Sequence, residues 1–198
     1  MNRRTVLKNL ALVLGGAVLL PACMHPDGTN YVQLKHIQLT DSQQDLIADI
    51  ADTIIPHTNT PGAKDLKLPA FIIKMFDDCY GKEGQIAIFK GIEDFVALVN
   101  KSYSKTFVEL STREKEDILN GLEKAANTEE SSKKAAIDKS KPSNEIKLSP
   151  LSTFYREIKR QTIFAYTTSQ YFMTKQIVYE LIPGRYNAHF PVKNVKTA

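Results

Sequence analysis

The residue types that most often carry chemistry are few in this sequence, and their spacing forms no site. The chain of 198 residues has four histidines and two cysteines. No histidine stands three or four residues from another metal-ligating residue type, the spacing that places two ligands on one face of a helix. The histidines are His25, His36, His57 and His189. We therefore expect no metal site in this chain.

Asp77 and Asp78, next to Cys79, are the strongest candidates for a carboxylate site. Successive helix residues point about 100° apart, so the two carboxylates would not converge as a catalytic dyad does. We interpret them as solvated charges near a helix end. The sequence also lacks the G-x-S-x-G, G-x-G-x-x-G and C-x-x-C-H patterns of common hydrolases, dinucleotide-binding domains and c-type haem proteins. We expect neither catalysis nor a bound cofactor in this chain.

The first 22 residues have the pattern of an export signal. Arg3, Arg4 and Lys8 precede an apolar run over 10–20, which is too short to span a bilayer core that needs roughly 20 residues. The stretch "NRRTVLK" matches the twin-arginine pattern, with Asn2 where that pattern usually has Ser. An ordinary secretory signal that happens to hold two arginines is the alternative.

The apolar run ends in "LLPAC", which is similar to the lipobox of bacterial lipoproteins. Acylation of Cys23 would anchor the mature protein to a membrane of the bacterial envelope, on the periplasmic side, without spanning it. Simple cleavage after Ala22 is the alternative, because Pro21 is unusual in a lipobox. An acylated Cys23 leaves Cys79 without a partner in the chain, so we expect a buried inert thiol there, or else an intermolecular disulfide.

Charge and composition indicate a single globular domain that does not bind nucleic acid. The formal net charge is +4, and loss of the three basic residues of the leader lowers it to +1. A nearly neutral chain offers no electrostatic reason to expect a nucleic acid partner. With 42% hydrophobic residues, the mature chain can form an ordinary core.

The hydrophobic periodicity predicts an all-α, compact multi-helix domain over residues 39–190, after a tether at 23–38 and before a tail at 191–198. Thr40 or Asp41 caps the first helix, and Ser111 with Glu114 forms a capping box. The expected helices cover residues 41–55, 69–80, 83–103, 112–126 and 150–182. In the third helix we expect an apolar stripe to face the core. Its members are Ile86, Phe89, Ile92, Phe95, Val96 and Val99.

Two segments between these helices have their own composition. Pro61-Gly62 suits the central positions of a type II turn. Residues 127–147 are rich in Lys, Ser and Glu and nearly lack large apolar residues, so we expect a long, mobile polar insertion. A solvated helix at the start of this insertion is an equally good interpretation.

Several stretches together resemble the gluconate 2-dehydrogenase subunit 3 family, the small subunits of membrane-bound sugar and polyol dehydrogenases. They are the twin-arginine leader, "LTDSQQDLIADIADTIIPHTNTPGAKDLKLPAFI", "DDCY" and "TTSQYFMTKQIVYELIPGRY". The resemblance runs from about Leu39 to Tyr186. It implies a non-catalytic subunit that binds a flavin-containing large subunit of the glucose-methanol-choline type. That large subunit carries FAD, commonly lacks a signal of its own, and would be co-exported already folded.

The resemblance also suggests which residues face the partner. The candidates are Pro61, Gly62, Tyr166, Ser169, Tyr179 and Tyr186. Tyrosine suits interfaces because it buries a large apolar ring and keeps a polar tip, although each of these rings could equally belong to the core. A lipid anchor at Cys23 would reduce the need for a cytochrome c subunit as the membrane anchor. A stand-alone envelope lipoprotein and a free-standing periplasmic redox enzyme are the alternative functions.

Overall fold

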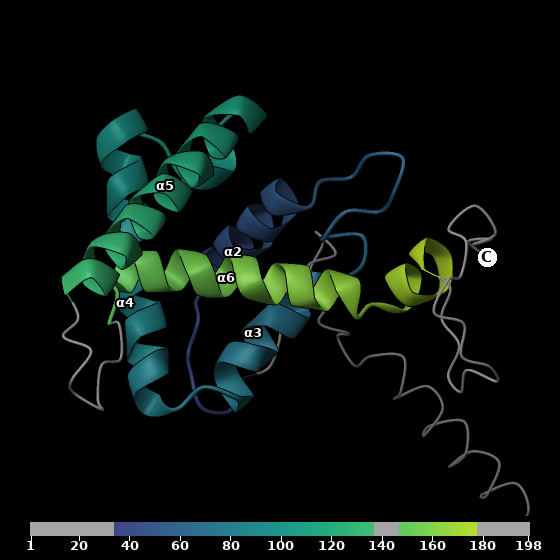
Figure 1. Cartoon of the computed structure of the whole chain (residues 1–198). Helices are drawn as coiled ribbons and strands as arrows, with labels where there is room; N and C mark the ends of the chain where they lie inside the picture. Colours follow the sequence, from purple (N-terminus) through teal and green to yellow (C-terminus); the bar gives the residue numbers. More distant parts are fainter. Residues whose placement is uncertain (1–33, 137–146, 178–198) are drawn as a thin grey trace, which may run out of the picture. The chain divides into compact units, whose positions relative to one another are not determined.

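The computed structural model describes residues 34–136 and 147–177, and every regular element in these two ranges is helical (Figure 1). This confirms the all-α class. The expected leader, Cys23, most of the tether and the tail lie outside the described residues. The elements are α2 (Asp41–Ile54), α3 (Leu68–Asp78), α4 (Lys82–Tyr103), the 3-10 helix η2 (Phe107–Glu109), α5 (Thr112–Ala136), α6 (Pro150–Thr167) and the π-helix η3 (Phe172–Gln176).

Local side-chain caps set the starts of three helices. Thr40 caps α2 and exchanges hydrogen bonds with Gln43, which forms a capping box. The expected box of Ser111 and Glu114 is present at the start of α5, where the Ser111 N–H donates to the Glu114 carboxylate over 2.8 Å. Ser149 caps α6 and is followed by a proline in the first turn. These caps satisfy backbone N–H groups that the helices themselves leave without acceptors.

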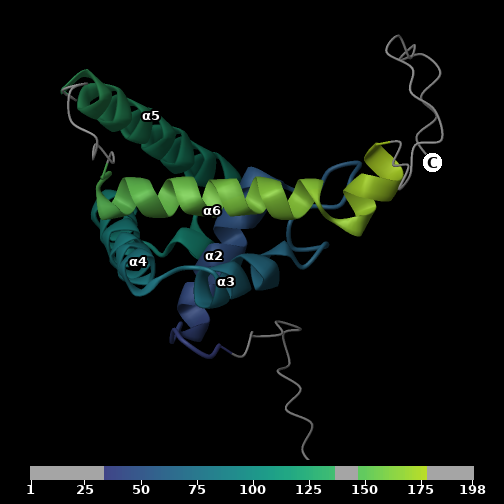
Figure 2. The ribbon, with the colours of Figure 1, turned by 60° about the horizontal axis from the view of Figure 1, so that its bottom comes forward.

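Helix α6 is the centre of the arrangement, since it contacts α2, α3, α4 and α5 (Figure 2). The closest approach is to α4, where Gly91 lies against the backbone of α6. A Cβ at position 91 would stand 2.3 Å from the Phe154 Cβ and 2.5 Å from the Pro150 carbonyl oxygen. Only glycine allows the two helices to cross this closely.

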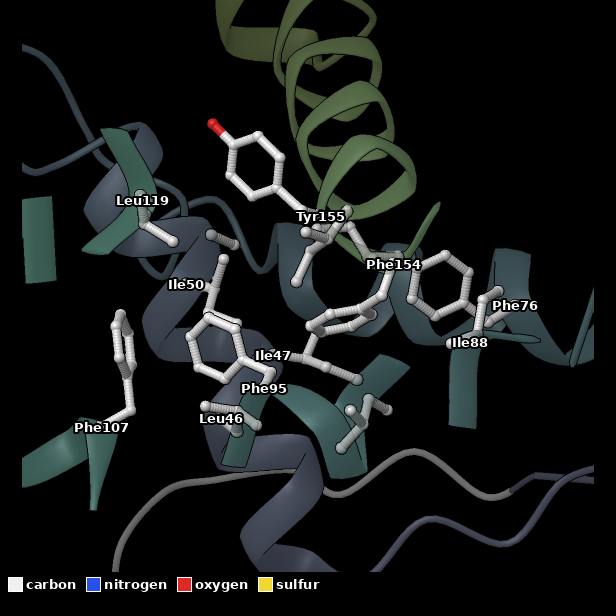
Figure 3. Packing of buried hydrophobic residues seen from close by; sticks show 14 of the residues in the cluster. Leu46, Ile47, Ile50, Phe76, Ile88, Phe95, Phe107, Leu119, Phe154 and Tyr155 are labelled. Carbon is white, nitrogen blue, oxygen red and sulfur yellow. The ribbon is translucent and has the colours of Figure 1, made fainter. Parts of the chain in front are cut away.

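The core lies between α6 and the other helices (Figure 3). Phe95 of α4 packs edge-on against Phe107 at 5.2 Å and against Phe154 at 6.0 Å between ring centroids. Ile47 and Ile50 of α2 are fully buried in the same cluster. This arrangement joins segments that are far apart in the sequence into one hydrophobic core.

The expected stripe on α4 is wrong at two positions. Ile86 and Val96 are exposed, and Ile88 is buried in their place. Position 88 lies three and four residues before Gly91 and Ile92, so it belongs to the face that the close crossing with α6 covers. The periodicity therefore identified the helix, whereas the exact face was set by the glycine crossing.

Of the two interpretations of residues 127–147, the solvated helix is correct for the first ten residues, which continue α5 to Ala136. Glu129 accepts hydrogen bonds from the Ser149 N–H at 2.7 Å and from the Ser152 hydroxyl at 2.6 Å. Lys133 binds Glu129 one turn away at 2.6 Å. A polar helix is stable here because its carboxylates bind the start of α6. Residues 137–146 lie outside the described ranges.

Candidate partner-binding surface

The loop between α2 and α3 does not contain the expected type II turn. Such a turn needs a hydrogen bond from the Ala63 N–H to the Thr60 carbonyl and a positive φ at Gly62. Instead, the Ala63 N–H donates to the Ile55 carbonyl at 2.8 Å, and the φ of Gly62 lies outside the left-handed region. The Pro-Gly pair crosses back over the end of α2.

Position 62 requires a glycine because its backbone lies against the backbone of residues 56 and 57. A Cβ there would stand 2.5 Å from the backbone nitrogen of His57 and 2.8 Å from the carbonyl carbon of Pro56. The Gly62 N–H donates to the Asp65 carboxylate at 2.8 Å, and the same oxygen binds His57 Nδ1 at 2.7 Å. Gly62 is buried and Pro61 is half-buried, so this part of the loop is packed tightly against itself.

A buried carboxylate fastens the same loop to the helices. Asp49 of α2 binds Lys64 of the loop and Lys115 of α5, the latter at 2.7 Å. Burial alone would raise the Asp49 pKa, but the hydrogen bonds from Lys115 and Lys64 outweigh it and lower that pKa. Asp49 therefore stays ionised, and its ion pairs join the loop, through Lys64, and α5, through Lys115, to α2.

The other expected partner-facing residues lie around the end of α6. Tyr166 is half-buried, and its ring packs edge-on against Phe172 of η3 at 5.5 Å. The Ser169 hydroxyl donates to the Tyr166 carbonyl at 2.7 Å and accepts from the Phe172 N–H at 3.2 Å. Ser169 thus shapes the turn from α6 into η3. Tyr179 and Tyr186 lie outside the described residues.

The loop and η3 extend past the same end of α6 in both ribbon views (Figures 1 and 2). The two predicted partner-facing segments, which are about a hundred residues apart in the sequence, are therefore on one side of the domain. An exposed aromatic pair joins α3 and α6. Phe71 of α3 and Phe164 of α6 have ring centroids 6.1 Å apart. The sequence analysis did not select either residue, because a single exposed apolar residue in an amphipathic helix resembles its buried neighbours.

Asp78 is exposed, as expected for a solvated charge, but the same interpretation is wrong for Asp77. It is buried, not solvated, and accepts hydrogen bonds from the backbone N–H groups of residues 35, 36 and 37 at 2.8, 2.7 and 2.9 Å. Burial would raise the Asp77 pKa, but the three N–H donors outweigh it and lower that pKa. Residues 35–37, which the sequence assigns to the tether, therefore belong to the folded domain.

Cys79 is exposed, so the expectation of a buried thiol is wrong. Cys79 is the C-terminal cap of α3. Phe76 occupies the core position there, and the ring of Tyr80 packs edge-on against the ring of Phe76 with 5.4 Å between centroids. The aromatic ring of Tyr80 fills the place next to the core, and the thiol is left on the outside.

The described residues hold no cluster of three or more His, Cys, Asp or Glu side chains that could bind a metal ion. His36 and His57 lie in separate segments, and His25 and His189 lie outside the described ranges. No helix among the described residues is long and apolar enough to cross a membrane. The described residues form a helical domain with one tightly packed loop between α2 and α3 and an exposed pair of aromatic rings on α3 and α6.

A comparison with protein families decides what such a domain is. The model of gluconate 2-dehydrogenase subunit 3 matches residues 41–184, which include all the helices described above. This chain belongs to the gluconate 2-dehydrogenase subunit 3 family. The family is that of a small subunit of a dehydrogenase complex, so a role in binding other subunits follows from membership. No curated protein and no solved structure matches the chain.

Proposed function

We propose that this protein is the non-catalytic small subunit of a periplasmic-side flavoprotein dehydrogenase of the gluconate, sugar or polyol type. Its partner is a large subunit of the glucose-methanol-choline type that carries FAD, and a cytochrome c subunit can complete the complex. The family match over residues 41–184 carries this proposal. The substrate is oxidised on the large subunit, and this chain contributes binding, export and anchoring.

The leader gives the chain its part in export. Arg3 and Arg4 direct the twin-arginine route, which carries folded proteins. A large subunit that takes up FAD in the cytoplasm is folded before it crosses the membrane, so it needs this route. Acylation of Cys23 then holds the complex on the periplasmic side of the membrane.

The fastened loop supports a role in binding. A surface that is already ordered loses little conformational entropy when a partner docks on it. The ion pair between Asp49 and Lys64, together with the contacts of Asp65 inside the loop, gives the loop between α2 and α3 this order. The half-buried ring of Tyr166 adds the kind of side chain that protein interfaces favour.

The test is fractionation of native cells that produce a C-terminally tagged copy of the full chain. The doubly substituted variant Arg3→Lys, Arg4→Lys keeps the positive charge of the leader, so an ordinary secretory signal would still work. We expect the copurifying large subunit and its FAD to move from the membrane fraction, where the acylated Cys23 holds them, to the cytoplasmic fraction in this variant. Lys8→Arg is the matched control and should leave both in place.

Two other results would contradict the proposal. If the tagged wild-type chain copurifies with no FAD-containing large subunit, the subunit role is wrong, and a stand-alone envelope lipoprotein or a free-standing redox enzyme takes its place. If the large subunit binds but its location does not depend on Arg3 and Arg4, the escort role is wrong. Cys23→Ala tests anchoring separately, because it should release an intact complex into the soluble periplasmic fraction.

A further inference from the structure

The first described residues are fixed beside the C-terminal end of α3 (purple in Figure 1). Asp77 is only 1% exposed and accepts hydrogen bonds from the three successive backbone N–H groups of residues 35–37. Leu34, Ile37 and Leu39 pack against the hydrophobic core on either side of this contact. The chain therefore enters the domain at one defined place. We call the contact between Asp77 and residues 35–37 the Asp77 clamp.

The corner that carries the Asp77 clamp is itself held together by hydrogen bonds. The side-chain amide of Gln85, in α4, donates to the backbone carbonyls of Phe76 and Asp77, the latter at 3.0 Å. The Cys79 N–H donates to the Met75 carbonyl at 3.0 Å and closes the last turn of α3. The end of α3, the start of α4 and the N-terminal segment thus meet at one corner, which gives the clamp a fixed support.

The clamp shortens the free chain between Cys23 and the domain. The chain from Cys23 to Lys35 spans at most about 40 Å. Without the clamp, the first fixed residue would be Thr40, the cap of α2, and the reach would be about 60 Å. A domain of about 150 residues is roughly 40 Å across, so half its circumference is about 60 Å. Only the unclamped chain is long enough to pass round the domain.

Helix α3 separates the clamp from the loop between α2 and α3. The helix has 11 residues, Leu68–Asp78, and is therefore about 16 Å long. The loop joins α3 at its N-terminal end, whereas Asp77 lies in its last turn. The loop and the point where the N-terminal segment leaves the domain are thus at opposite ends of one helix.

We propose that the Asp77 clamp orients the lipid-anchored domain, so that the C-terminal end of α3 and the turn into α4 face the bilayer and the loop between α2 and α3 faces away from it. This rests on the function proposed above, in particular on acylation of Cys23, and names the device that sets the geometry of anchoring. Asp77 is a positioning residue, since it acts through the backbone of residues 35–37. The orientation leaves the loop accessible to the FAD-bearing large subunit.

The test measures energy transfer from a donor fluorophore on the purified, acylated full chain to acceptor-labelled lipids in phosphatidylethanolamine and phosphatidylglycerol vesicles. One donor is attached to Cys79, which is exposed and is the only free thiol of the chain once Cys23 carries lipid. The other is attached to the exposed position 59 of the loop, in the variant Cys79→Ser, Asn59→Cys. Transfer should be more efficient from Cys79 than from position 59.

Two changes test whether the clamp causes this difference. Asp77→Asn should make transfer from the two positions equal, whereas the matched control Asp78→Asn should keep the wild-type difference. Because Asp77→Asn also lowers stability, circular dichroism should show that it is folded. The second change leaves the clamp intact and inserts a Gly-Ser linker of about 20 residues after Gly28, with an r.m.s. length of about 25 Å. It should equalise the two positions without a change in melting temperature.

The outcomes distinguish this proposal from the one on which it rests. If mass spectrometry finds no acyl chain on Cys23, the anchoring role fails, and the orientation fails with it. If the acylated wild type transfers equally from both positions, or more from position 59, only the orientation is wrong. If folded Asp77→Asn keeps the wild-type difference, the clamp does not set the orientation. If the lengthened chain keeps it, contacts of the domain with lipid set the orientation, which also overturns this proposal.

Discussion

Replacement of Asp77 by asparagine tests whether one buried carboxylate holds the N-terminal segment on the domain. In the wild type, Oδ1 accepts from the N–H groups of His36 and Ile37, and Oδ2 accepts from that of Lys35. An asparagine can place its one oxygen at the Oδ1 position. Its amide group then faces the Lys35 N–H, so a donor meets a donor and that bond is lost.

The cost follows from the number and type of these bonds. A hydrogen bond to a charged group contributes about 1.5–3 kcal/mol, and roughly half of that remains when the acceptor becomes neutral. One lost bond and two weakened ones give a loss of about 3–6 kcal/mol in the free energy of unfolding. If the segment detaches instead, burial of the Ile37 side chain is lost as well, at about 1.5–3 kcal/mol.

Denaturant unfolding of the purified protein measures this loss, and hydrogen exchange at the amides of residues 35–37 locates it. Asp78→Asn is the control. The exposed carboxylate of Asp78 forms an ion pair with Lys74, and its replacement should lower the free energy of unfolding by less than about 0.5 kcal/mol. If Asp77→Asn is as stable as Asp78→Asn and those three amides stay protected, the carboxylate does not fasten the segment.

Acid should reduce the difference between wild type and Asp77→Asn. The folded-state pKa of Asp77 lies below its unfolded value, so its stabilising contribution is complete above the unfolded pKa of about 3.9. It is lost as the pH falls through the lower folded-state pKa. The free energy of unfolding of the wild type should therefore approach that of the variant below about pH 4.

Three further changes test other contacts by thermal or denaturant unfolding. Gly91→Ala should destabilise the protein by about 2 kcal/mol, because the added Cβ meets Phe154 of α6. Gly121→Ala should stabilise it by about 0.5–1 kcal/mol, because a Cβ added there has no other atom within 4 Å. Equal effects of the two changes would refute the close crossing. Gly62→Ala should cost roughly 2–3 kcal/mol because its Cβ meets backbone, and a neutral result would show that the loop can shift. Glu129→Gln should lower stability near neutral pH. Its carboxyl pKa falls from 4.5 to about 2, mainly through the bond from a lysine, so the deficit should shrink as the pH drops from 4.5 towards 2, and a pH-independent deficit would contradict the assignment.

The helices and their starts were predictable because they depend on local chemistry. The capping box of Ser111 and Glu114 involves residues three positions apart, and the periodicity of α2 appears within four turns. Such signals need no knowledge of the rest of the fold. The same holds for Ser149 and the proline after it, which mark the start of α6.

The errors concern contacts between distant segments. The carboxylate of Asp77 is buried by a segment about forty residues away, so its neighbours in the sequence gave no indication of its partners. Gly62 was assigned to a turn by residue type, although it is required by contact with His57. The exposure of Phe71 and Phe164 was not predicted either, because it depends on how α3 and α6 pack.

The contacts of Glu129 and Lys133 have a practical consequence for experiments on the intact complex. Glu129 binds Ser149, and Lys133 also binds the carbonyl of Lys147, so the chain is fixed on both sides of residues 137–146. When the ends of a segment are held together, each doubling of its length costs only about 0.6 kcal/mol in closure entropy. This position therefore suits an internal epitope or fluorescent label, which leaves both chain ends unmodified and allows the subunit to be followed through export.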